Sequence, residues 1–171
     1  IRIVLFQNTK DMISALIRKQ VDAVSGVLPE DVATVEKIQG INNYQIGLPA
    51  YVGAFFNLKS PILSNPKVRQ AFAYSTDRKA IISDSLGGQG AIAYYPIPAG
   101  FVGFNGTAQK YQYDEARAQE LIQQSGVGKN NLRLVTLNNP VYKKVAEKLA
   151  ESWRKLGQNV EVITADRKST R

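Results

Sequence analysis

The sequence predicts an α/β domain in which helices flank a mixed β-sheet. Segments with strand-like composition alternate with segments of helical periodicity along most of the chain. Hydrophobic residues make up 44% of the sequence and charged residues 21%, both close to the averages of globular domains. The 171 residues are enough to bury one good hydrophobic core, or two small ones.

The chain is predicted to begin with a strand, a helix and a second strand. Residues 2–6 are rich in side chains that favour strands. Residues 11–19 place three apolar side chains on one side of a helix. A short strand at residues 21–24 should end at Ser25-Gly26.

A second helix is predicted to begin at Pro29. Proline suits the first turn of a helix, and the carboxylates of Glu30 and Asp31 favour its positive end. We expect this helix to continue to about Lys37 and to end before Gly40.

Two strands and two capped helices are predicted next. The strands are residues 43–48 and 52–58, the second of them aromatic. At residues 64–66 a cap residue precedes a proline at the first helical position. Residues 75–77 cap a further helix, which should end at Gly87-Gly88.

The C-terminal half is predicted to form a long loop and a strand–helix–strand unit. The loop, residues 87–109, has no periodicity, and ordered loops of this length are commonly functional. A helix at 115–124, capped by Asp114, precedes strands at 132–137 and 160–164. A longer helix between these strands begins at Pro140, and its inner face should carry Val141, Val145, Leu149, Trp153 and Leu156.

The residue types argue against an enzyme. The chain contains no Cys and no His, which excludes thiolate nucleophiles, imidazole acid–base chemistry and the usual zinc ligands. The glycine-rich segments 87–90 and 100–106 lack the strand–turn–helix context of nucleotide-binding loops. We expect no catalytic site, no metal and no cofactor, and a hydrolase that uses carboxylates alone ranks last.

The net charge of +8 leaves a second function open. From Lys129 onward there are ten Lys or Arg against four Asp or Glu. Such an excess is typical of a small basic nucleic-acid-binding domain. However, the basic residues of the helix after Pro140 alternate with Glu147 and Glu151 at three- and four-residue spacing, as on a solvated helix face.

Tyrosines in predicted loops are candidate ligand contacts. A tyrosine offers an apolar face and a polar tip, which suits the wall of a ligand groove. Ordinary loop packing is the simpler explanation for any single one of them. The candidates are Tyr51, Tyr94, Tyr95 and Tyr142.

Residues 65–81, NPKVRQAFAYSTDRKAI, resemble a signature of the family 5 extracellular solute-binding proteins, the peptide- and nickel-type receptors of ABC importers. Further elements occur in the order that this family has. An aromatic-Asn pair comes before the signature, and a glycine-rich turn, a Pro-x-Pro loop, a Tyr-Asp helix and a Trp-x-x-Leu-Gly segment come after it. These elements are Phe56-Asn57, residues 87–90, residues 96–98, residues 113–121 and residues 153–157.

The resemblance implies a periplasmic-binding-protein-like lobe of a two-lobed protein that closes on its ligand. Residues 1–166 would form most of the second lobe, and residues 167–171 a disordered or vector-derived tail. The first lobe is expected upstream. The resemblance also implies an extracytoplasmic protein that captures peptides, or a similar small solute, and delivers them to an ABC-transporter permease. Contact with the membrane would be indirect, through a lipid anchor or the permease.

The resemblance suggests the residues that contact the ligand. The loop with Asn138, Asn139 and Tyr142 matches one that supplies ligand contacts in relatives, although some relatives carry Arg where this sequence has Asn. Tyr51 is a second choice by the same analogy. Tyr94 and Tyr95, chosen above as loop tyrosines, complete the set.

Three motif residues are expected to hold structure instead. Asn57 and Arg69 are expected to be buried, and a buried polar side chain must find hydrogen-bond partners. Asp77 is expected to cap a helix.

Overall fold

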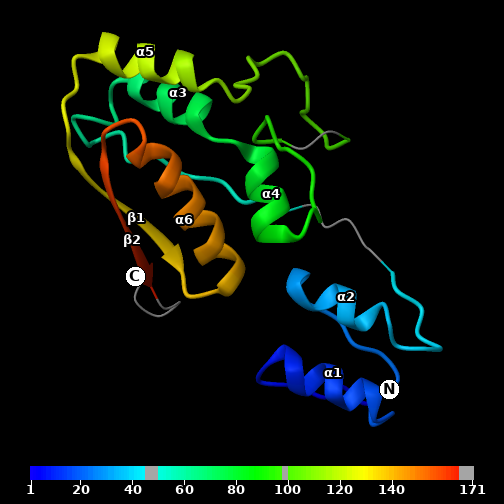
Figure 1. The fold of residues 1–171 in the computed structure, drawn as a ribbon. Coiled ribbons are helices and arrows are strands. Elements are labelled where there is room, and N and C mark those ends of the chain that lie inside the picture. The colour runs from blue at the N-terminus through cyan, green and yellow to red at the C-terminus, as the bar shows by residue number, and fades with distance from the viewer. Residues whose placement is uncertain (45–49, 98–99, 166–171) are drawn as a thin grey trace. The chain divides into compact units, whose positions relative to one another are not determined.

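We describe the chain from a computed structural model, which covers residues 1–44, 50–97 and 100–165 (Figure 1). The contacts divide the chain into two compact units, Ile1–Leu48 and Pro49–Arg171. No helix among the described residues is long and apolar enough to cross a membrane.

The first unit is built from short helices. Helix α1, Thr9–Ile17, is capped by Asn8, whose side chain accepts a hydrogen bond from the Asp11 backbone N–H at 2.9 Å. The helix buries Ile13, Ala15 and Leu16, so the predicted apolar side is confirmed in part. The helix predicted at Pro29 begins as a 3-10 turn, η1 (Pro29–Asp31), and continues as α2 (Val32–Val35).

Several predicted strands are wrong. Residues 2–6, 21–24 and 52–58 form no strand, and neither do residues 43 and 44. Residues 45–48 of the same predicted strand lie outside the described residues. A strand exists only where a second strand accepts and donates its backbone hydrogen bonds, and apolar composition alone does not supply that partner.

The second unit contains a parallel strand–helix–strand motif, and the predicted elements are confirmed there. Strand β1 (Asn131–Leu137) leads into helix α6 (Pro140–Arg154), which returns the chain to strand β2 (Asn159–Ala165). The strands pair in register from Asn131 opposite Asn159 to Leu137 opposite Ala165. Figure 1 shows α6 packed along one face of this pair. The described sheet is therefore parallel, whereas a mixed sheet was predicted.

Three further helices of this unit have the predicted caps. Helices α3 (Pro66–Ser75), α4 (Arg78–Leu86) and α5 (Glu115–Ser125) follow Asn65, Asp77 and Asp114. Each cap side chain accepts a backbone N–H from the first turn, at 2.8–3.0 Å. Helices α4 and α5 end at Gly87 and Gly126, both in the left-handed conformation that glycine adopts without strain.

The core of the second unit lies where α3, α5 and α6 meet the sheet. Phe72 from α3 stacks on Trp153 from α6, with ring centroids 4.7 Å apart. Phe56 packs against both rings at about 6 Å. Fully or largely buried side chains around them are Val68, Ala71, Ala118, Leu121, Ile122, Ala150, Leu156 and Val160. These contacts hold helix α6 against the core, and they thereby position residues 138 and 139, which connect β1 to α6.

Candidate functional site

The start of α6 brings three predicted ligand residues together. Asn139 is its N-cap, and its side-chain oxygen accepts the backbone N–H groups of Val141 at 2.9 Å and Tyr142 at 3.3 Å. Asn138 continues the strand ladder, because its N–H donates to the Ala165 carbonyl at 3.2 Å. Tyr142, the third residue of the helix, is 38% exposed.

This position is the carboxyl end of β1, at the strand-to-helix turn. In open parallel sheets, ligands bind outside the carboxyl ends of the strands. The side-chain oxygen of Asn139 is already engaged in capping, so its role in holding α6 is structural. The exposed ring of Tyr142 is free to contact a solute.

Tyr94 and Tyr95 form a second group, in the loop between α4 and α5. Both rings are half-buried. The Tyr95 hydroxyl donates to the Gly106 carbonyl at 2.9 Å, and its ring meets Phe104 edge-on at 5.3 Å. The ammonium of Lys110 lies 5.6 Å from the Tyr94 ring centre and 5.9 Å from that of Tyr95. Tyr94 and Tyr95 therefore contact other residues of the same loop, and one of these residues is the cation Lys110.

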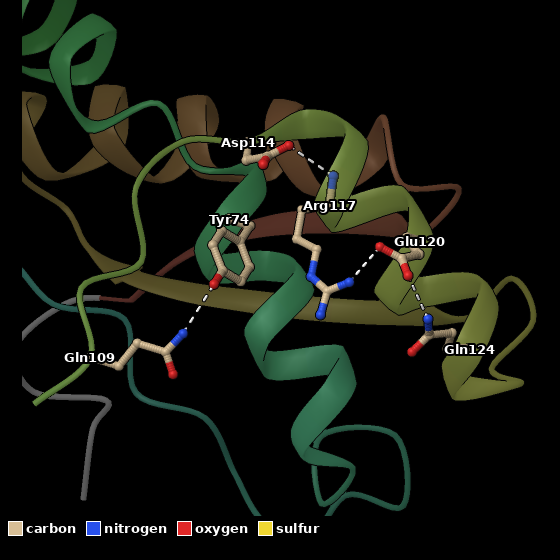
Figure 2. Close-up of polar contacts among 6 residues, drawn as sticks. All are labelled: Tyr74, Gln109, Asp114, Arg117, Glu120 and Gln124. Atoms are coloured by element: carbon tan, nitrogen blue, oxygen red, sulfur yellow. Dashed lines mark hydrogen bonds and ion pairs between the residues drawn. The ribbon is translucent and has the colours of Figure 1, made fainter.

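The end of this loop is fixed to α3. The Asp114 N–H donates to the Tyr74 carbonyl at 2.9 Å, and the Tyr74 ring meets Tyr111 edge-on at 5.2 Å. Figure 2 shows the Gln109 amide pointing toward the Tyr74 hydroxyl, with an N–O distance of 3.1 Å. In the same view Asp114 caps α5 through the Arg117 N–H. The segment from Gln109 to Asp114 thus has a defined path against the helix.

Arg78 ties the loop to the junction of α3 and α4. One of its terminal nitrogens, Nη1, donates to the carbonyls of Tyr111 at 2.8 Å and Ala73 at 3.3 Å. Burial of the guanidinium lowers the pKa of Arg78, while the nearby Tyr94 raises it by a smaller amount. A half-buried cation is therefore held at the Tyr111 carbonyl, one residue after Lys110.

Tyr51 stands apart from these two groups in the described contacts. It lies in residues 50–58, which form neither helix nor strand, and its side chain is 46% exposed.

The three residues expected to hold structure differ in their surroundings. Arg69 is half-buried, and its Nη1 donates to the carbonyls of Leu63 and Ser64, both at 2.8 Å. Asn57 is exposed, so the expectation that it is buried is wrong. Its side-chain oxygen accepts the Lys59 N–H at 3.1 Å, which stabilises a local turn. Asp77 caps α4.

A charged pocket of about 190 Å³ lies between α4 and α6. Lys148 bridges Asp84 at 3.2 Å and Glu151 at 3.5 Å across it. The hydrogen bond to Asp84 and the charge of Glu151 raise the pKa of Lys148. None of the six predicted ligand residues lines this pocket; its lining is Ser75, Asp77, Ala80, Ile81, Asp84, Tyr113, Lys148, Glu151, Ser152 and Lys155. The charged side chains Asp84, Lys148 and Glu151 of this pocket are thus paired with one another.

Sequence reasoning missed Lys110 and Arg78. Both are ordinary basic residues in the sequence, and neither belongs to a pattern that predicts ligand contact. Only the path of the loop brings Lys110 back over Tyr94, sixteen residues earlier.

The whole chain matches a known family. Residues 1–171 match the family described as bacterial extracellular solute-binding proteins, family 5, in its middle part. Heme-binding protein A of Haemophilus influenzae is 32% identical over 122 residues, which are 67% of this chain and 22% of that protein. A dipeptide-binding protein of Escherichia coli is 30% identical over 144 residues, 80% of this chain and 26% of that protein. The chain thus spans about a quarter of the length of these curated relatives.

Solved structures show the same fold. The ABC transporter substrate binding protein CtaP of Listeria monocytogenes superposes with a TM-score of 0.85 at 22% identity, covering 96% of this chain and 34% of that one. The oligopeptide-binding protein AppA of Bacillus subtilis, solved with a nonapeptide, gives 0.77 at 21% identity, with 96% and 36% covered. The α/β architecture is thereby confirmed as that of a periplasmic-binding-protein lobe. The chain belongs to the bacterial extracellular solute-binding proteins of family 5, a family of binding proteins rather than enzymes.

Proposed function

We propose that the full-length protein carrying these residues is the substrate-binding component of an ABC importer and that it captures peptides. The observation that supports this most strongly is the family match along residues 1–171. Relatives at about 30% identity are named for dipeptide and oligopeptide binding. The match favours solute binding over the nucleic-acid alternative that the basic charge raises.

The proposal also assigns residues 1–166 a place in the full-length protein. Residues 1–166 would supply most of one lobe, and a second lobe would close over the solute. Coverage of about a third of each solved relative agrees with a chain that is one portion of a larger receptor. The tail predicted at residues 167–171 lies outside the described residues.

We place solute contacts at the two groups of residues described above. The exposed Tyr142 ring, with Asn138 and Asn139 beside it, would meet the solute at the carboxyl end of β1. Tyr94 and Tyr95 would supply apolar contact from the loop, and Tyr51 would add a third aromatic. Capture would depend on hydrogen bonds and shape, with no covalent step and no cofactor.

The partners follow from this role. The solute would be taken up outside the cytoplasmic membrane and passed to the permease subunits. Membrane contact would be indirect, through a lipid anchor or through the permease, and no nucleic acid would bind. Retention of the protein on DNA that weakens steeply with salt would contradict this last point.

A thermal-shift screen of the full-length protein tests the proposal. A solute that binds only the folded state raises its stability by about 2.7 kcal/mol at a hundredfold excess over Kd. We expect di- to oligopeptides to raise the Tm, and an unrelated sugar to leave it unchanged. A rise with heme and with no peptide would keep the family assignment and reject peptides as the solute.

A further inference from the structure

Lys110 presents its charge from a fixed place in the loop. Its ammonium lies over the faces of both Tyr94 and Tyr95, at 5.6 and 5.9 Å from the ring centres. The negative face of an aromatic ring attracts a cation in this position. The side chain is nevertheless exposed, so the ammonium is accessible to a ligand. The two ring faces thus favour this position of the ammonium before any ligand arrives.

One of the two rings beneath the ammonium, that of Tyr95, is held by further contacts. The Tyr95 hydroxyl is bonded to the Gly106 carbonyl, and its ring packs edge-on against Phe104. Lys110 itself precedes Tyr111, whose carbonyl accepts from Arg78. Tyr95 and the residue after Lys110 are therefore each held in place by a hydrogen bond.

Arg78 contributes a second positive charge to the segment that carries Lys110, because it binds the carbonyl of the next residue, Tyr111. It is half-buried, holds the Tyr111 carbonyl, and interacts electrostatically with Tyr94. Within the part of the chain that the structure describes, neither Arg78 nor Lys110 forms an ion pair with a carboxylate. The nearest acidic residue in sequence, Asp77, is engaged in capping α4. Among the described residues, Lys110 over the tyrosine rings and Arg78 at the adjacent Tyr111 carbonyl are thus two cations without a partner carboxylate.

We propose that Lys110, placed over Tyr94 and Tyr95 and supported by Arg78, recognises a carboxylate group of the solute. This proposal rests on the proposed function and names the chemical group that the tyrosine loop would receive. A cationic group is disfavoured there, because the ring faces already hold an ammonium and Arg78 adds repulsion. A carboxylate would gain charge-assisted hydrogen bonds, and its apolar neighbours would contact the exposed part of the rings.

The first experiment uses the 171-residue chain and needs no knowledge of the solute. Sodium acetate is titrated at constant ionic strength against chloride, and the amide and aromatic NMR signals of residues 94, 95 and 110 are followed. We expect saturable shifts with acetate and none with tetramethylammonium chloride. Lys110→Met should weaken acetate binding about tenfold, the value of one charge-assisted hydrogen bond. Lys129→Met removes the same charge from an exposed loop and should leave the affinity unchanged.

The second experiment compares peptides that have a free C-terminal carboxylate with their amides, in the full-length protein. We expect the free acids to bind about tenfold more tightly, and the preference to disappear in Lys110→Met. Acetate shifts that are absent, or that persist in Lys110→Met, would overturn the carboxylate site even if peptides bind. Acetate binding at Lys110 in a protein that captures no peptide would leave the carboxylate site standing and reject peptide capture.

Discussion

At the scale of single residues, the polar side chains with local partners were predictable from sequence. Asn65, Asp114 and Asn139 each bond to a backbone N–H two or three residues away, so the sequence spacing contains the whole interaction. Lys110 was not predictable, because its partners Tyr94 and Tyr95 lie across a loop with no periodicity. Rules for helix caps concern residues a few positions apart, so they cannot predict a contact between residues 94 and 110.

Arg69 should contribute measurably to stability. Arg69→Met removes two 2.8 Å hydrogen bonds to the carbonyls of Leu63 and Ser64, and we expect a loss of about 1–3 kcal/mol in the free energy of unfolding. Urea denaturation followed by circular dichroism measures it. Lys67→Met removes the same charge from the exposed side of α3 and should change the midpoint little. Equal effects of the two substitutions would contradict a structural role for the Arg69 bonds.

At the scale of elements, helices were predicted better than strands. Each helix of the second unit carries its own start signal, and α4 and α5 also carry a glycine stop signal. Strands β1 and β2 were found because one helix joins them, which is the arrangement that parallel pairing requires. The strand predicted at residues 52–58 has no pairing partner in the described structure, and composition could not reveal this.

The cap of α6 should be separable from any contact with solute. Asn139→Ala removes the acceptor for two N–H groups, and we expect it to cost about 1 kcal/mol of folding stability. Asn139→Asp keeps the acceptor and should restore most of that loss. If the alanine and aspartate variants unfold at the same urea concentration, Asn139 does not stabilise α6 as a cap.

Two glycines that follow α5 offer a matched test of backbone conformation. Gly126 has φ of 66°, where a Cβ is strained, so Gly126→Ala should destabilise the protein by about 1 kcal/mol. Gly128 has open space around its Cα and no such φ, and Gly128→Ala should be nearly neutral. Thermal melting of both variants distinguishes them. A neutral Gly126→Ala would show that α5 does not end in a left-handed residue.

At the scale of the whole molecule, the sequence indicated the α/β class and the family, and the comparisons confirm both. The signature segment 65–81 contributes to the packing of the second unit. It contains Phe72, which stacks on Trp153, and Arg78, which fixes the loop that carries the tyrosines. The placement of the six ligand candidates could not be predicted, because it depends on contacts between segments far apart in sequence.

The Phe72–Trp153 contact should dominate the stability of the second unit. Phe72→Ala leaves a cavity against the indole, and we expect a loss of about 3–5 kcal/mol in the free energy of unfolding. Phe55→Ala removes a ring that is 91% exposed and should have little effect. Denaturation followed by the fluorescence of Trp153, the single tryptophan, measures both variants. Similar losses in the two variants would mean that this stack is not the centre of the core.

As a member of its family, the full-length protein is proposed to capture peptides. Isothermal titration calorimetry with a panel of di- to nonapeptides tests it most directly. We predict one saturable site per molecule for at least one peptide, with affinity reduced in Tyr142→Leu. If the protein is folded by circular dichroism and no peptide in the panel gives binding heat at two temperatures, peptide capture is contradicted.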